Sequence, residues 1–388
     1  MRGHSYAEFI YFTYIARSIR LTASLRVLHL ENSNVQGRIL LMLAAALKDN
    51  HVLKELYLGD NKLQPVDGQS LCSIIKENKC LDVLDLKNNS LLDAGLSHMC
   101  SGLSELARAD FGLKALVLAG NGLTATGVSY LAKALLHNRS LVSLNVSQNA
   151  LTNEAVYELK DALIVNKQIS CLFLAKTRLT DEGAVALAEY VAETGALRRL
   201  DLRENDIRLG GLMALASALK FNGTLARLDL DREPKRESSV RDSGETARRL
   251  LKDIADFCMR NKRSEQLERD ARIRRQEEEE EEDRKRRESV VVVNVAHKTG
   301  EVAELESKSK EDGKEKEDED DECVDVVKEE DELLRKILAR ETPSLFSPVK
   351  PNDEDLMSYF KLVDKNYDEK LSRSCGLSIQ ASGDTEQG

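Results

Sequence analysis

Arginine and aspartate alternate along two short stretches of the chain, residues 199–203 and 227–231. In an extended strand, residues two apart point to the same side, so each stretch presents guanidinium and carboxylate groups on one face. Such groups either bind a charged partner surface or pair with one another, and exposed pairs contribute little stability. Both alternatives stay open, and the candidate protein-binding residues here are Arg199, Arg203 and Arg227.

Apolar side chains occupy the equivalent places in earlier stretches of the sequence. Tyr57, Val117 and Phe173 are expected to be exposed, with Val83 and Cys171 beside them. An exposed apolar patch of this kind is typical of a protein interface. We therefore predict that these five residues contribute to a binding surface.

Residues that could support catalysis do not gather into a motif. The sequence has six histidines, none of them paired at metal-ligand spacing, and neither a glycine-rich phosphate loop nor a nucleophile elbow. The seven cysteines form no Cys-x-x-Cys pair, and an odd number without clusters favours a reducing compartment. We expect a non-catalytic cytoplasmic protein without metal or cofactor. Mixed charge along the strands disfavours nucleic-acid binding, and no segment approaches membrane-spanning length.

A repeat positions these residues. The pattern Leu-x-x-Leu-x-Leu-x-x-Asn-x-Leu, with other apolar residues allowed for Leu, recurs at intervals of 28 residues, with one interval of 32. Helical spacing follows each pattern, with apolar residues eighteen and twenty-two positions after its start. This period predicts an α/β leucine-rich repeat solenoid of the ribonuclease-inhibitor type, whose strands form a concave face that binds partners. The repeats start at Leu25, Leu53, Leu81, Leu113, Leu141, Ile169, Leu197 and Leu225.

Two asparagine positions recur in the pattern. The first is expected to point inward and bond backbone groups of the turning chain, with Ser33 and Thr177 as weaker substitutes. The second, twenty-five residues after each start, is expected to end the helix in a left-handed conformation. It holds Asn50, Asn78, Asn138, Asn166 and Asn222.

The sequence divides into five parts. Residues 1–24 match the helix of a repeat whose strand is missing, so we expect a fragment with further repeats upstream. Residues 25–233 form the array, interrupted by an insertion at 104–112, and residues 234–262 a helical cap carrying Leu250, Ile254 and Phe257 on one face. Residues 263–288 are charged on every face and predict a solvated helix or coiled coil, or disorder. Residues 289–388 predict a disordered tail.

The tail carries short motifs of several kinds. Its acidity is local, because residues 301–332 hold 17 acidic and 5 basic side chains against a net charge of −10 for the whole chain. Apolar residues at 333–338 and 357–362 are candidate docking segments. Weak phosphorylation motifs surround Ser289, Thr342 and Ser347, and the basic residues 284–287 are of the type found in nuclear import signals.

Several segments resemble the protein phosphatase 1 regulatory subunit 37 family of leucine-rich repeat proteins. These are residues 25–32, 53–63, 200–215 and especially 228–237, Leu-Asp-Leu-Asp-Arg-Glu-Pro-Lys-Arg-Glu. The resemblance covers roughly residues 12–260 and implies an intracellular protein that binds and inhibits the protein phosphatase 1 catalytic subunit. The docking motif of that family, a basic residue, Val or Ile, any residue, then Phe or Trp, lies upstream of its repeats and is absent from this sequence.

Two other functions remain open. An array of this period with an acidic tail also resembles the activator of the Ran GTPase, which would accelerate GTP hydrolysis by its partner. Alternatively, the chain is a pure scaffold that binds proteins through the concave face and the tail without changing the rate of any enzyme.

Overall fold

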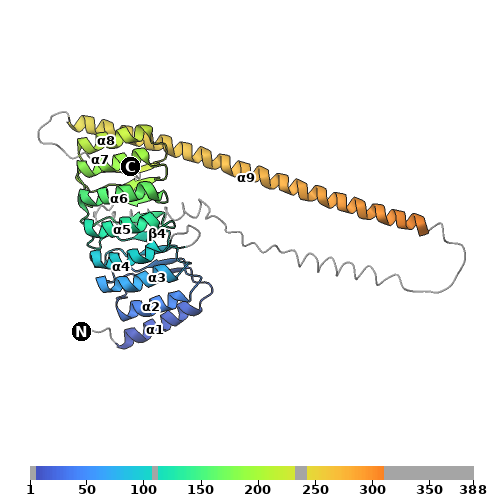
Figure 1. Cartoon of the computed structure of the whole chain (residues 1–388), viewed down its shortest axis with the longest axis horizontal. Helices are drawn as coiled ribbons and strands as arrows, with labels where there is room; N and C mark the ends of the chain where they lie inside the picture. The colour runs from blue at the N-terminus through green and yellow to red at the C-terminus, as the bar shows by residue number, and fades with distance from the viewer. Residues whose placement is uncertain (1–5, 107–111, 232–242, 310–388) are drawn as a thin grey trace, which may run out of the picture. The chain divides into compact units, whose positions relative to one another are not determined.

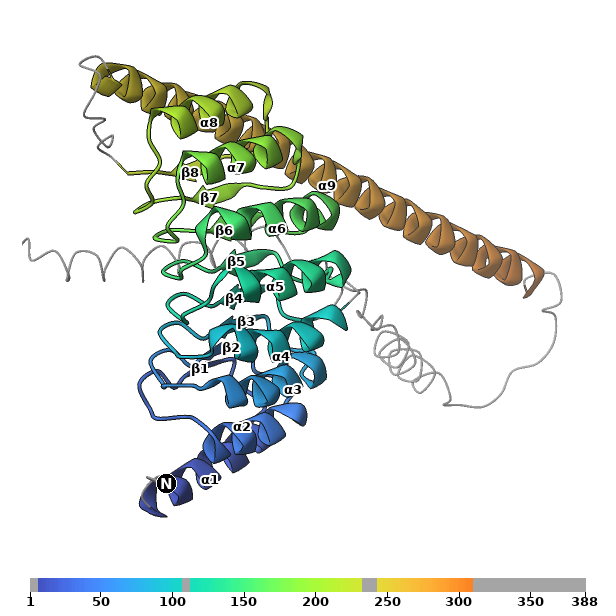
Figure 2. The same cartoon turned by 60° about the vertical axis from the view of Figure 1, so that its left-hand side comes forward.

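The computed structural model describes residues 6–106, 112–231 and 243–309, with side chains from residue 10 to residue 285 within these ranges. Short parallel strands stack in chain order into one sheet, and a helix follows each strand from β1 to β7 along the same side (Figures 1 and 2). The strands are β1 (Val27–His29), β2 (Glu55–Tyr57), β3 (Val83–Asp85), β4 (Ala115–Val117), β5 (Ser143–Asn145), β6 (Cys171–Phe173), β7 (Arg199–Asp201) and β8 (Arg227–Asp229).

Helices cover one face of this sheet and leave the other face open, as Figure 2 shows. The predicted stacking of repeats as parallel strands is confirmed, because each strand pairs in register with the next. The helices are α1 (Tyr6–Leu21), α2 (Arg38–Lys48), the short 3-10 helix η1 (Pro65–Asp67), α3 (Gly68–Glu77), α4 (Leu92–Ser104), α5 (Ala125–His137), α6 (Thr152–Asn166), α7 (Asp181–Glu193), α8 (Leu209–Phe221) and α9 (Ser243–Ser309).

Leucine fills the space between sheet and helices. The central residues of the strands from β2 to β7, such as Leu116, Leu144 and Leu172, are fully buried, and those of β1 and β8 are partly buried. The two apolar positions of each helix face them, as the four-residue spacing predicts, and Leu131 with Leu135 on α5 is one such pair. The repeat pattern therefore specifies a continuous apolar core, of which each repeat supplies one layer.

The inward asparagines join neighbouring repeats. In four repeats the side-chain carbonyl accepts two backbone N–H groups of the preceding repeat: Asn149 Oδ1 lies 2.9 Å from Asn121 N and 3.0 Å from Leu123 N. Its amide Nδ2 donates to Leu118 O at 3.0 Å and to Val146 O at 2.9 Å. Asn61, Asn89 and Asn205 accept in the same way.

Two forms of the loop after the strand decide whether these bonds form. Four loops have positive φ at the seventh and ninth residues after the repeat start, as at Gly120 and Gly122. In these loops the N–H groups of the eighth and tenth residues donate to the next asparagine. The loops starting from Leu81 and Leu141 have positive φ at the seventh and eleventh residues instead. There Leu92 N donates to Asn121 O and Thr152 N to Thr177 O, so the next side chain receives no such bond.

The loop form explains the hydrogen bonding of Asn121 and Thr177, which both follow a loop of the second form. Asn121 Oδ1 is buried and accepts no hydrogen bond from the described residues. Thr177, predicted to be a weaker substitute, instead suits its place, because the loop before it has no N–H groups to offer. Its hydroxyl donates to Leu174 O at 2.6 Å.

The second asparagine position does not adopt the predicted left-handed conformation. Asn78, Asn138 and Asn222 have extended backbones, with φ between −85° and −69°. Their side chains explain why this position recurs: Asn222 Nδ2 donates to Val191 O and Thr194 O of the preceding repeat, and its Oδ1 accepts from Thr224 and Leu225. The position therefore forms a second ladder of hydrogen bonds between repeats and needs no left-handed residue.

Both ends of the array carry a helix. At the first repeat, α1 packs against α2 and buries Ile19. At the last repeat, α9 buries Ile254 and Cys258, while Leu250, Leu251 and Phe257 pack against the core.

Polar groups of α9 continue the second asparagine ladder. Asn261 Nδ2 donates to Asn222 O at 3.0 Å and Leu225 O at 3.1 Å, and Arg260 donates to Leu219 O at 3.0 Å. Two of these carbonyls, those of Leu219 and Asn222, correspond to the two that Asn222 bonds in the preceding repeat. The helix therefore ends the array by supplying the hydrogen bonds of a further repeat.

Candidate protein-binding surface

The first and third residues of each strand point away from the helices and form the strand face. Val27 and His29 are exposed at its first strand, and Arg227 is exposed at its last. Between them, from β3 to β7, nearly every residue of the face is buried. The predicted binding residues therefore differ widely in accessibility.

The expectation that Tyr57 and Phe173 are exposed is wrong. Their side chains are 7% and 5% exposed. Neighbouring strands of a sheet lie about 4.8 Å apart, so a large side chain covers an in-register neighbour, as His29 covers Tyr57, or a diagonal one, as Arg199 covers Phe173. The His29 ring stacks on Tyr57 with 4.3 Å between ring centroids, and the Arg199 guanidinium lies 4.9 Å from the centroid of Phe173.

The other predicted apolar residues are also less open than expected. Val83 and Cys171 are buried, with 3% and 1% exposed, and only Val117 is half-buried. Polar Ser143 and Asn145 on β5 separate Val117 from Phe173. The structure therefore divides the predicted apolar patch in two.

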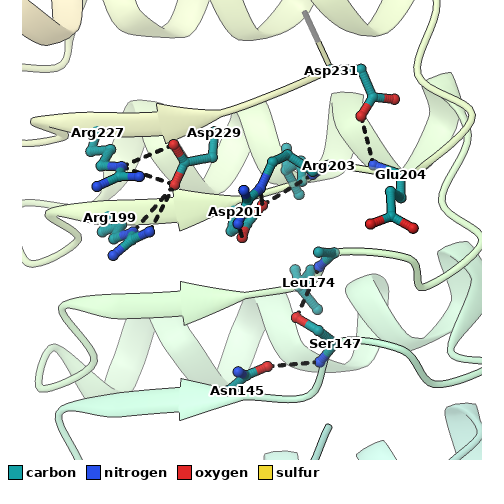
Figure 3. Close-up of polar contacts among 12 residues, drawn as sticks. Asn145, Ser147, Leu174, Arg199, Asp201, Arg203, Glu204, Arg227, Asp229 and Asp231 are labelled. Carbon is teal, nitrogen blue, oxygen red and sulfur yellow. Dashed lines mark hydrogen bonds and ion pairs between the residues drawn. The ribbon is translucent and has the colours of Figure 1, made fainter. Parts of the chain in front are cut away.

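Arginine and aspartate of the last strands pair with one another, which was one of the two alternatives (Figure 3). Asp229 accepts from Arg199 at 3.1 Å and from Arg227 at 2.9 Å. Asp201 accepts from Arg203 at 2.7 Å. Arg199 is 7% exposed and Asp201 1% exposed, so of the predicted basic residues Arg203 and Arg227 are the accessible ones.

Three acidic or amide side chains at the third strand position have a structural role that the sequence analysis missed. Asn145 Oδ1 accepts the N–H of Ser147 at 3.0 Å, and Asp85 and Asp201 accept from Lys87 and Arg203 in the same way (Figure 3 shows those of Asn145 and Asp201). Such bonds to the backbone two residues on form a turn. The signal in the sequence is Asp or Asn at the end of a strand.

A charged cluster lies over the first three strands. The Lys87 ammonium is 2.8 Å from Glu31 and 3.3 Å from Asp85. Burial raises the pKa of Asp85 although Lys87 opposes this shift. Burial also tends to raise the pKa of Glu31, but hydrogen bonds from Lys87 and His29 outweigh it and lower that pKa. Lys87 therefore favours the charged form of both carboxylates, which together with His29 outweighs burial at Glu31 but does not outweigh it at Asp85.

Other predicted features have separate outcomes. Within residues 6–106, 112–231 and 243–309, no group of three His, Cys, Asp or Glu side chains could hold a metal ion. Across the same part of the chain, every helix is too short or too polar to cross a membrane. The side chain of Ser289, like residues 107–111 of the insertion, lies outside what the structure describes, as do Thr342, Ser347 and the tail docking segments.

Comparison with protein families identifies the repeat. The profile of the leucine-rich repeat family matches residues 49–72, 113–132, 137–160 and 197–216. Each match contains a strand of the sheet and part of the helix that follows it. The array is a leucine-rich repeat solenoid.

Three curated relatives are similar to this leucine-rich repeat chain. Two are named protein phosphatase 1 regulatory subunit 37 homolog: that of Caenorhabditis briggsae is 36% identical over 126 residues, and that of Caenorhabditis elegans 39% over 118. Protein phosphatase 1 regulatory subunit 37 of Bos taurus is 42% identical over 129 residues. The matches cover 32%, 30% and 33% of this chain but only 14%, 12% and 18% of the relatives.

Proposed function

We propose that this chain is a non-catalytic regulatory subunit that binds and inhibits the catalytic subunit of protein phosphatase 1. The supporting observation is the 36–42% identity to three relatives that carry the name of such a subunit. The solenoid supports it independently, because leucine-rich repeat arrays present an extended preformed surface to partners. The proposed setting is a reducing compartment, consistent with thiols at Cys72, Cys80, Cys100, Cys171 and Cys258.

The proposed contact surface is the accessible part of the strand face. The sequence lacks the basic-Val/Ile-x-Phe/Trp segment, so within this chain another surface must hold the phosphatase. Val117 in the middle of the face and Arg203 and Arg227 at its end are the predicted residues that a partner can reach. The buried residues Tyr57, Val83, Cys171, Phe173 and Arg199 would act by positioning these neighbours.

A binding and turnover assay tests the proposal. The full chain is immobilised, the purified phosphatase catalytic subunit is bound, and its hydrolysis of a phosphopeptide is measured with and without the chain. Val117→Asp is expected to weaken binding at least tenfold, whereas Gln69→Asp, an exposed change on α3, leaves it unchanged. Arg227→Ala provides a second strand-face variant if Val117→Asp lowers the thermal stability.

The outcomes distinguish the three functions. Binding together with reduced turnover supports the proposal. Binding with unchanged turnover supports a scaffold that does not regulate the enzyme. Failure to bind the phosphatase, with accelerated GTP hydrolysis by purified Ran, would replace the proposal with GTPase activation.

A further inference from the structure

A row of exposed apolar side chains crosses the outer surfaces of three neighbouring helices. Tyr157 on α6 is 47% exposed, Val185 on α7 41% and Met213 on α8 53%. Each lies sixteen residues after the start of its repeat, so the three occupy the same place on helices that pack side by side (Figure 2). We call Tyr157, Val185 and Met213 the outer row.

The repeat architecture does not require apolar residues at this position. Gln69, Ser97 and Ser129 occupy it in α3, α4 and α5, and these helices fold onto the core in the same way. Leu41 holds it in α2 and is 60% exposed, but three polar repeats separate it from the outer row. Three consecutive exposed apolar residues on one solvent face therefore indicate a contact surface rather than a need of the fold.

Acidic side chains lie beside the outer row on α6 and α7. Helices α6 and α7 together carry seven acidic residues and one lysine, a net charge of −6. That lysine, Lys160, pairs with Glu189 at 2.8 Å. Asp161 follows Tyr157 by four residues, and Glu182 precedes Val185 by three, so carboxylates flank the row at helical spacing.

We propose that the outer surface of α6, α7 and α8 binds a basic amphipathic helix of a partner protein. Its apolar face would lie along the outer row, and its Lys or Arg side chains would meet the carboxylates beside it. Packed helices lie 8–10 Å apart, so the row spans roughly 20 Å, which corresponds to about 13 residues of helix at 1.5 Å per residue. The negative charge disfavours a membrane as the occupant, because anionic lipid headgroups would be repelled.

This surface lies on the opposite side of the sheet from the strand face. A partner helix on α6–α8 therefore leaves the strand face free, and the inference does not depend on the proposed phosphatase contact. If both hold, the solenoid binds two proteins at once.

A model peptide tests the inference on the full chain. The probe is a fluorescein-labelled 18-residue peptide of leucine and lysine with one apolar helical face, and its binding is followed by fluorescence anisotropy at physiological salt. The triple variant Tyr157→Ser, Val185→Ser, Met213→Ser is expected to raise the Kd at least tenfold. The matched control Leu41→Ser, Val66→Ser, Tyr130→Ser also removes three exposed apolar side chains and is expected to change the Kd less than twofold.

Neither triple variant alters a charge, so general attraction of the peptide to acidic segments affects both equally. Asp161→Asn with Glu182→Gln is expected to weaken binding about threefold, whereas Glu279→Gln with Glu280→Gln on α9 leaves it unchanged. Equal affinities of the wild type and the outer-row variant would overturn the inference. So would recruitment to anionic phospholipid vesicles that is lost in the outer-row variant, because a membrane would then be the occupant.

Discussion

Replacing Asn149 by alanine should remove one of the polar joints between neighbouring repeats. Its Oδ1 accepts two buried N–H groups, those of Asn121 and Leu123, and its Nδ2 donates to three carbonyls. A buried donor left without a partner costs roughly 1–3 kcal/mol, so the two N–H groups alone imply a loss of about 2–6 kcal/mol in the free energy of unfolding.

Asn121→Ala provides an internal control of the same chemistry. Asn121 is equally buried, but its Oδ1 accepts nothing from the described residues, and its Nδ2 donates to Leu86 O at 2.9 Å and Ala119 O at 3.3 Å. The change therefore strands no N–H group and removes an unsatisfied oxygen. We expect the loss to be about 2–6 kcal/mol smaller than for Asn149→Ala, the cost of the two stranded N–H groups.

Urea unfolding of the full chain measures the difference. The sequence contains no tryptophan, so circular dichroism at 222 nm is the appropriate signal. Repeat arrays can unfold in parts, so hydrogen exchange of α5 and α6 should accompany it and show where Asn149→Ala acts. Equal losses for the two variants would refute the assignment of two loop forms.

Three further variants test other parts of the structure. Lys87→Met leaves the buried Asp85 and the half-buried Glu31 without their cation, which raises their pKa values in the folded chain. The loss of stability should be full at pH 7, shrink as the pH falls through these raised pKa values, and vanish once both carboxyls are also protonated in the wild type. A loss in urea unfolding that is independent of pH, or one shared by the exposed Lys62→Met, would contradict this. Asn261→Leu should destabilise the last repeat by about 1–3 kcal/mol and speed hydrogen exchange in α8, whereas Lys262→Ala next to it should do neither. Unchanged exchange in the Asn261→Leu variant would show that the hydrogen bonds of Asn261 do not stabilise the last repeat. Gly127→Ala would place a methyl group against Asp93 Oδ1, which accepts a hydrogen bond from the Thr124 N–H, and should lower the thermal midpoint of unfolding. The control Gly195→Ala places its methyl group in open space and should not. Equal midpoints for the two variants would mean that the Asp93 side chain can move aside without cost.

The periodic sequence is sufficient to predict the solenoid. Position-by-position comparison of repeats assigned Leu144 and Leu172 to the core and Leu131 to the buried stripe of a helix, because spacings of two and four residues match strand and helix geometry. The insertion aside, each element falls where the period places it. Each apolar spacing is a weak indication in one repeat, but its recurrence in every repeat identifies the strands and helices.

Features that vary between repeats could not be read in this way. Whether Phe173 is exposed depends on Arg199 one repeat later, and whether Asn121 is satisfied depends on the loop before it. A pattern averaged over repeats carries no information on such pairs. The hydrogen bonds of Arg260 and Asn261 were also not predicted, because these residues take the place of a repeat asparagine although α9 does not carry the repeat pattern.

The two loop forms also limit how such an array can be shortened or rearranged. Excising only the repeat that begins at Leu113 would set the loop of residues 88–92, which offers no N–H pair, before Asn149, whose oxygen needs one. Excising the next repeat as well would join that same loop to Thr177, the side chain that already follows a loop of this form. At this junction, removing two adjacent repeats keeps the loop matched to the side chain that follows it, whereas removing one does not.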